Sequence, residues 1–116
     1  MRHRKKKITL GREKAQREAL MRSLAESLIL HGAIKTTSAK AKALRTVVEP
    51  LVTKAKRGNL FDKRMVSKVL YTKLAVEKLM KDIGPRYKDR QGGYTRITKI
   101  GSRPNDGAEV VRIEFV

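Results

Sequence analysis

Residues 110–116 read Val-Val-Arg-Ile-Glu-Phe-Val, and this stretch decides the fold class of the chain. Its apolar residues Val111, Ile113 and Phe115 alternate with charged ones, and a period of two residues is typical of a strand with one buried face. We therefore predict a strand that packs its apolar side on the rest of the domain and turns its charged side outward.

A second strand is predicted just before it, over residues 94–100. Turn signals flank this stretch, Gly92-Gly93 before it and Asn105-Asp106-Gly107 after it. The two strands are therefore expected to form a hairpin. A short extended piece around residues 34–36 could add a third strand.

Apolar residues also recur at helical spacing in the first two thirds of the chain. The first helix is predicted over residues 13–30, with Gly32 where a helix stop belongs. The second begins at a cap, Ser38, and ends at Gly58. Within it Glu49-Pro50 removes a backbone donor, so either the helix kinks there or two shorter helices abut.

Two shorter helices are predicted to follow, beginning at the caps Asp62 and Thr72. Together the elements predict an α+β fold, with about four helices packed on a small mixed sheet of about three strands. Residues 1–12 carry six cations and no acid, so we expect an extended basic arm there. Residues 13–116 are expected to form one α+β domain.

The net charge points to a polyanionic partner. The 116-residue chain has 29 Lys and Arg against 11 Asp and Glu, a formal charge of +18. A domain of this length has a radius of gyration of roughly 13 Å, so its like charges repel one another unless anions gather round it. Phosphate backbones supply anions at high density. Nucleic acid is therefore the predicted partner, ahead of an acidic protein surface.

Composition argues against several other classes. The chain has no Trp and only two Phe, and its longest apolar run is a few residues, so no membrane partner and no secretory signal are expected. It has no Cys, which removes disulfides and thiolate metal sites and fits a reducing, cytoplasmic compartment.

Catalysis is not predicted either. His3 and His31 are the only histidines, with no Cys to complete a zinc site. Most carboxylates lie four residues from a cation on a predicted helix, where such pairs contribute roughly 0.2–0.5 kcal/mol each. We expect no enzyme activity, no metal, no cofactor and no small-molecule substrate.

Basic and hydroxyl side chains favour phosphate contact in three places: the arm, the start of the second helix and the segment before the hairpin. The second helix has a single acid, Glu49, against six cations over residues 40–57. The predicted RNA-contacting residues are Arg2, His3, Arg4, Lys5, Lys6, Lys7, Arg12, Arg17, Lys35, Thr36, Thr37, Lys40, Arg86, Tyr87, Arg90, Gly93, Tyr94 and Arg96.

Some of these residues have two interpretations. Gly92-Gly93 is either a tight turn or a place where backbone amides approach a phosphate closely. The rings of Tyr87 and Tyr94 either stack on RNA bases or pack against the hairpin. Tyr71 adjoins apolar helix positions and is expected in the core.

Several motifs carry a family resemblance. Gly-Pro-Arg-Tyr at 84–87, Arg90, and Gly-Gly-Tyr-Thr-Arg-Ile at 92–97 closely resemble the bacterial large-subunit ribosomal protein seventeen family. The opening Met-Arg-His-Arg-Lys, Ile-Lys-Thr-Thr at 34–37 and Val-Val-Glu-Pro-Leu at 47–51 resemble it too, in the same order. The resemblance covers nearly the whole chain.

This resemblance implies a structural role on large-subunit ribosomal RNA, near the tunnel exit. The implied partners are that RNA and neighbouring large-subunit ribosomal proteins, with no homo-oligomer expected. The implied place is the cytoplasmic ribosome of a bacterium rather than of an organelle. Two other classes stay open: a DNA-binding regulator or architectural protein that inserts the helix over residues 39–57 into a major groove, and a nuclease or RNA-modifying enzyme. Pro50 weighs against the first, and the lack of an acid or histidine cluster against the second.

Overall fold

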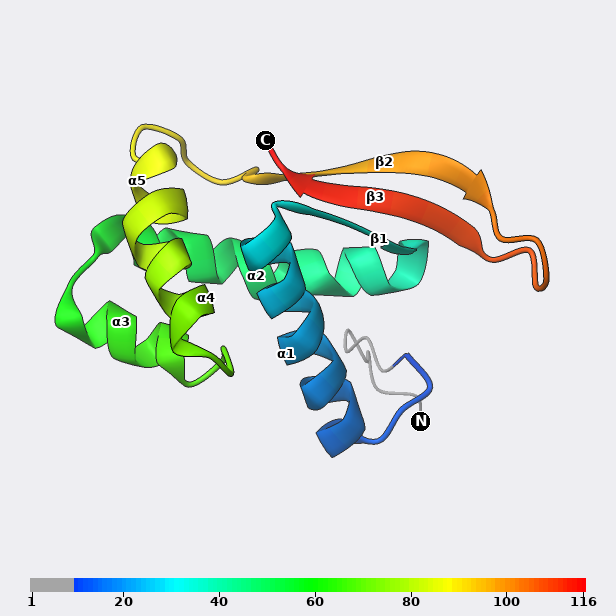
Figure 1. Ribbon diagram of the computed structural model, residues 1–116, viewed down its shortest axis with the longest axis horizontal. Helices are drawn as coiled ribbons and strands as arrows, with labels where there is room; N and C mark the ends of the chain where they lie inside the picture. Colours follow the sequence, from blue (N-terminus) through cyan, green and yellow to red (C-terminus); the bar gives the residue numbers. More distant parts are fainter. Residues whose placement is uncertain (1–9) are drawn as a thin grey trace, which may run out of the picture.

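The computed structural model describes residues 10–116, where six helical segments and three strands follow one another (Figure 1). Their bounds are α1 Lys14–His31, β1 Ala33–Thr37, α2 Ser38–Arg57, α3 Leu60–Ser67, α4 Lys73–Lys78, the π-helical η1 Leu79–Ile83, α5 Gly84–Arg86, β2 Thr95–Ser102 and β3 Glu109–Phe115. The last three helical segments follow one another without a break, so the predicted four helices and three strands of an α+β fold are confirmed.

The three strands form one sheet with β3 in the middle, in the order β1-β3-β2. Ile34, Ile113 and Ile97 stand side by side in one row across the sheet. Both pairings of β3 are antiparallel. The predicted mixed sheet is therefore wrong, because the central strand runs opposite to both of its neighbours. Figure 1 shows the β2–β3 hairpin reaching beyond the end of the helical layer.

Within residues 10–116, one core cluster joins the inner face of the sheet to α2 and to buried residues of the other helices. Leu44, Val48 and Val52 of α2 are buried in one cluster with Val111 and Ile113 of β3. This confirms the predicted inward face of the last strand. Figure 1 shows α2 running along the sheet, with α1 crossing it and α3 and the α4–α5 segment gathered at its carboxyl end.

The second helix continues through Pro50, so the alternative of two abutting helices is wrong. An interior proline costs a helix about 3 kcal/mol. Val48 lies just before Pro50 and Leu51 just after it, and both are buried in the core. Anchoring on both sides of the proline offsets its cost, and Pro50 itself is exposed.

The helix ends confirm some of the predicted signals and correct others. Gly32 ends α1 in the left-handed region, φ 80°, and Thr72 caps α4 by accepting a hydrogen bond from the Ala75 amide at 3.3 Å. In contrast, Ser38 is the first residue of α2 rather than its cap. The prediction of Asp62 as the cap of α3 is also wrong, since its carboxylate accepts hydrogen bonds from Arg57 and Asn59 is the cap.

Gly84 explains how the last helical segment packs on α2. A Cβ at this position would lie 2.6 Å from the carbonyl oxygen of Ala55, well inside van der Waals contact. Only glycine lets α5 approach the α2 backbone this closely. Within residues 10–116, no helix combines the length and the hydropathy needed to cross a bilayer.

Candidate nucleic-acid interface

The predicted contacts Arg2, His3, Arg4, Lys5, Lys6 and Lys7 lie outside the described residues. The remaining ones fall into three groups: the start of α1, the junction of β1 with α2, and the stretch from α5 into β2.

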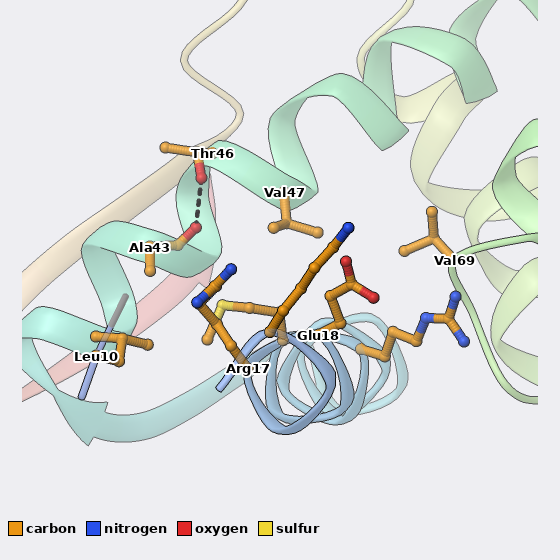
Figure 2. Close-up of a pocket in the computed structure, with 10 residues that line it drawn as sticks. Leu10, Arg17, Glu18, Ala43, Thr46, Val47 and Val69 are labelled. Atoms are coloured by element: carbon orange, nitrogen blue, oxygen red, sulfur yellow. Dashed lines mark hydrogen bonds between the residues drawn. The ribbon is translucent and has the colours of Figure 1, made fainter. Parts of the chain in front are cut away.

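At the start of α1, a turn holds two of the predicted arginines. Leu10 and Gly11 both have a positive φ, 53° and 65°. Arg12 donates to the Leu10 carbonyl at 2.9 Å, and Arg17 donates to the Arg12 carbonyl at 3.2 Å. The guanidinium of Arg17 is thereby held beside a groove between α1 and α2 (Figure 2). These bonds go to neutral carbonyls, so both positive charges remain available to an anion.

The second group lies where β1 meets α2. Lys35 is exposed on β1, while Thr36, Thr37 and Lys40 are half-buried. Thr37 occupies the cap position of α2, but its hydroxyl forms no capping bond in the described structure. The hydroxyl is therefore free to donate to a phosphate.

The outer face of the sheet adds cations that the site prediction missed. Arg112 is directly opposite Lys35 in the β1–β3 register. His31, Lys35 and Arg112 line one hollow of about 230 Å³ beside β1. The alternation of the last strand had already predicted that Arg112 points outward. The sequence contained no signal that it would lie beside Lys35, because 77 residues separate the two.

Arg96 on the same face is partly neutralised. It donates to the Glu114 carboxylate at 2.8 Å, and Arg112 approaches the other oxygen at 3.3 Å. The hydrogen bond from Arg96, followed by the nearby charge of Arg112, holds the pKa of Glu114 below its usual value. Two arginines therefore share one carboxylate, which leaves this face with excess positive charge.

The two tyrosines of the third group are in the core, so stacking on RNA is not open to them. Tyr87 and Tyr94 are 4 % and 2 % exposed, and their ring centroids lie 5.3 Å apart. Tyr87 donates its hydroxyl hydrogen bond to the Val116 carbonyl, and Lys56 donates to the Tyr94 hydroxyl at 3.1 Å. Both rings and both hydroxyls are occupied within the domain. The interpretation as packing against the hairpin is the correct one.

The Tyr94 hydroxyl sits in a polar setting despite its burial. Hydrogen bonds with the Gly92 backbone and with the Thr53 and Lys56 side chains lower the pKa of Tyr94, while burial acts in the opposite direction. The Tyr94 amide donates to both carboxylate oxygens of Glu49, at 3.1 and 3.0 Å. Glu49 therefore anchors the strand start to the middle of α2.

Gly92 and Gly93 lie at a surface bend, with φ values of 72° and 60°. Arg90 donates to the Gly93 carbonyl at 3.2 Å. Both glycines are exposed, so the close approach of a phosphate to this bend stays a prediction. Arg86 and Arg90 are exposed nearby, and Arg86 shares its charge with Asp82 at 3.2 Å.

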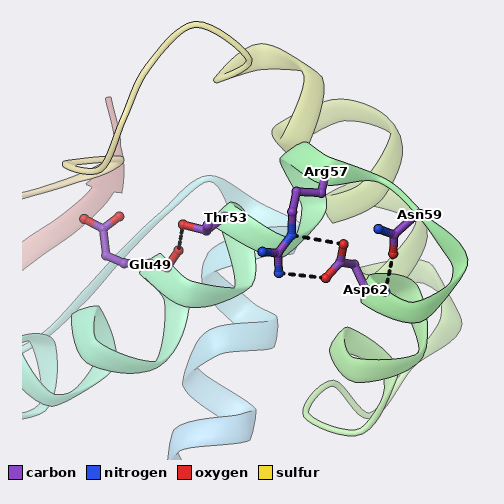
Figure 3. A network of polar contacts seen from close by, with 5 residues as sticks. All are labelled: Glu49, Thr53, Arg57, Asn59 and Asp62. Carbon is purple, nitrogen blue, oxygen red and sulfur yellow. Dashed lines mark hydrogen bonds and ion pairs between the residues drawn. The ribbon is translucent and has the colours of Figure 1, made fainter.

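Asp62, which was predicted as a cap, and Glu26 instead join separate elements of the fold. Asp62 is 1 % exposed and accepts two hydrogen bonds from Arg57, at 3.1 and 2.8 Å (Figure 3). The cap of α3 is Asn59, which accepts from the Asp62 amide at 2.8 Å. Because Arg57 attracts the carboxylate, the side chain three residues earlier takes over the capping.

Glu26 is the second such acid, buried in α1. It accepts hydrogen bonds from the Tyr71 amide, at 3.1 Å, and from the Thr72 hydroxyl. This contact fixes the loop before α4. Tyr71 itself is 55 % exposed with Arg22 over its ring, so its predicted core position is wrong. Its backbone, not its ring, holds the loop in place.

Comparison with known proteins agrees with the family resemblance of the sequence motifs. Residues 20–116 match the family described as Ribosomal protein L17. The chain belongs to this family. It is similar to the large ribosomal subunit protein bL17 of Gemmatimonas aurantiaca, 52 % identical over all of this chain and 98 % of that protein. It is also similar to the bL17 protein of an Exiguobacterium species, 53 % identical over 92 % of this chain and 96 % of that protein.

The structure shows what the L17-like motifs do in this chain. Glu49 binds the Tyr94 amide, Gly84 permits helix contact, and Tyr87 and Tyr94 pack together. These motif residues therefore join α2, the α4–α5 segment and the hairpin into one body. The cations next to them in sequence remain at the surface, so in this L17 family member one stretch of chain supplies both the fold and the exposed charge.

Proposed function

We propose that this protein is a structural constituent of the large ribosomal subunit that binds large-subunit ribosomal RNA through phosphate and shape contacts, near the tunnel exit. The proposal rests on the different placement of acids and cations. Glu26, Glu49 and Asp62 form hydrogen bonds or ion pairs that hold elements of the domain together, whereas most cations stay at the surface. The folded domain therefore offers a phosphate backbone a strongly positive exterior.

The partners in this proposal are ribosomal RNA and neighbouring large-subunit proteins, in a bacterial cytoplasm, without catalysis and without a homo-oligomer. The names of the relatives support it, since they are large ribosomal subunit proteins. The proposed RNA-facing residues are Arg2 to Lys7, Arg12, Arg17, Lys35, Thr36, Thr37, Lys40, Arg86, Arg90, Gly93 and Arg96. Tyr87 and Tyr94 act by positioning the bend and the strand beside these residues.

The DNA-binding alternative loses its main support. The helix over residues 39–57 is packed by α1, α3, α5 and the sheet, and seven of the residues in α2 are buried. A recognition helix needs one long free face to lie in a major groove. The central position of α2 therefore favours RNA recognition by the surface of the whole domain.

Sedimentation tests the proposal directly. The full chain should travel with large subunits in a sucrose gradient at physiological salt. It should also bind large-subunit RNA with an affinity that falls as salt rises, by roughly 0.7 to 0.9 logarithmic units for each phosphate contacted and each tenfold rise in salt. Duplex DNA of equal charge serves as competitor. Recovery in the ribosome-free fraction alone, or preference for the duplex, would contradict the proposal.

A further inference from the structure

A groove of about 610 Å³ lies between α1 and α2 (Figure 2). Its floor is apolar, formed by Met21 of α1, Ala43 and Val47 of α2, and Val69 in the turn after α3. This volume lies in the range of small-molecule sites, roughly 300–1,000 Å³. The groove is therefore large enough for a compact group with an apolar face.

Charged side chains form the rim of the groove, around this floor. Lys14, Arg17 and Arg22 line the groove together with a single acid, Glu18. Arg17 is oriented by its bond to the Arg12 carbonyl, and Arg22 by its position 5.7 Å from the Tyr71 ring centroid. The groove thus pairs an apolar floor with a rim of net positive charge.

A nucleotide has the matching chemistry, because a flat base with a large apolar face is joined to an anionic phosphate. We propose that this groove seats one unpaired nucleotide of an RNA, with its base on the floor and its phosphate against Lys14, Arg17 and Arg22. Glu18 then accepts a hydrogen bond from an amino group at the base edge. The inference rests on the proposed role in the ribosome and adds a single-nucleotide contact to it.

Other occupants fit less well. The amino-terminal segment that precedes Leu10 carries five cations over residues 2–7, and the cationic rim would repel them. A purely apolar helix would bury the rim charges without partners, at a high desolvation cost. A paired base cannot reach the floor, since unpaired bases are the ones that proteins take out of an RNA and stack on side chains.

Methyl NMR on the full chain tests nucleotide binding in the groove with two probes, adenosine 5′-monophosphate and ribose 5-phosphate. The nucleotide should shift the methyl signals of Met21, Val47 and Val69 and bind at least about fivefold more tightly than the sugar phosphate, which lacks the base. Equal affinities would show that the rim binds phosphate alone and would overturn the base seat. Tighter binding and displacement of the nucleotide by an acidic peptide of alternating Glu and Leu would overturn it in favour of a protein partner.

A variant pair separates this inference from the proposed function. Val47→Phe fills the floor without changing the charge, and Leu74→Phe places a ring of the same kind at an exposed position of α4, outside both the groove and the proposed interface. Val47→Phe should lower the affinity for ribosomal RNA about fivefold, because the base can no longer reach the floor. Equal RNA affinity of the two variants would overturn the seat while leaving RNA binding intact, whereas loss of RNA binding by the unsubstituted chain would overturn the ribosomal role.

The rim provides a second test that does not depend on how the core tolerates a larger ring. Arg17→Gln removes one rim charge, and Arg64→Gln removes one exposed charge on α3, away from the groove. Only Arg17→Gln should weaken nucleotide binding, by several-fold. Equal weakening by both variants would mean a diffuse charge effect and would overturn the seat.

Discussion

At the residue scale, the acids divide into those that hold the fold and those that lie at the surface. Asp62 is buried and receives two hydrogen bonds from Arg57, while Asp82 is 53 % exposed in its pair with Arg86. Burial strengthens such bonds, and removal of one partner leaves the other without its counterpart. The two carboxylates therefore make a matched pair for testing this difference.

We predict that Asp62→Ala lowers the free energy of unfolding by about 1.5–3 kcal/mol, the usual cost of losing hydrogen bonds between charged groups. Asp82→Ala is the control and should cost at most about 1 kcal/mol, because its ion pair is exposed. Urea unfolding followed by circular dichroism measures both. Equal midpoints for the two variants would contradict the structural role of Asp62.

Glu114 supports a prediction about pH. Its pKa is lowered in the folded state, chiefly by the hydrogen bond from Arg96. The carboxylate form is therefore favoured by folding, so this pair adds stability above the ordinary pKa of the carboxyl group and loses it as the pH falls through the lowered value. Arg96→Gln should move the pKa of Glu114 back toward its ordinary value.

A carboxyl-carbon NMR titration measures this shift directly. Arg103→Gln is the control, since Arg103 pairs with Asp106 in the hairpin turn rather than with Glu114. The control should leave the Glu114 titration where it is. An unchanged Glu114 titration in Arg96→Gln would mean that the sheet-face ion pair does not persist in solution.

At the scale of elements, the contact between α5 and α2 depends on one missing side chain. We predict that Gly84→Ala destabilises the fold by about 1–3 kcal/mol, the typical cost of overpacking, because its Cβ would meet the Ala55 carbonyl at 2.6 Å. Lys81→Ala, at an exposed position of the same helical segment, is the control. Thermal unfolding compares them, and a melting temperature for Gly84→Ala equal to that of the control would contradict the close contact.

Helices and strands were largely predictable because their signals are local. The spacing of the leucines and Gly32 gave the first helix, and the alternation over residues 110–116 gave the central strand. The caps were less predictable. The sequence predicted Asp62 as the cap of α3, whereas Asn59 caps this helix and the Asp62 carboxylate is bound by Arg57.

At the scale of the whole molecule, the salt dependence of RNA binding reports how many cations contact phosphate. We predict that replacing Arg2, Arg4, Lys5, Lys6 and Lys7 with Gln reduces the salt slope by up to about 4, if each of the five cations neutralises one phosphate. Filter binding to large-subunit RNA over a range of potassium concentrations measures the slope.

The matched control neutralises Lys63, Arg64 and Lys68 on and beside α3, which are exposed and outside the proposed interface. This variant should keep a slope close to that of the unsubstituted chain. A slope that falls equally per charge in both variants would indicate that the protein attracts RNA by net charge alone, without a defined interface.

The sequence by itself determined the α+β class, the four helices and the hairpin, and it predicts a polyanionic partner, because propensity, periodicity and net charge are properties of neighbouring residues or of simple sums. Only the tertiary structure decided the strand order, the burial of Tyr87 and Tyr94, and the exposure of Tyr71. It also decided that Glu49 would bind a residue 45 positions away. These outcomes depend on which distant surfaces pack together, since a side chain's burial and its hydrogen-bond partners are set by neighbours that the chain brings close only on folding.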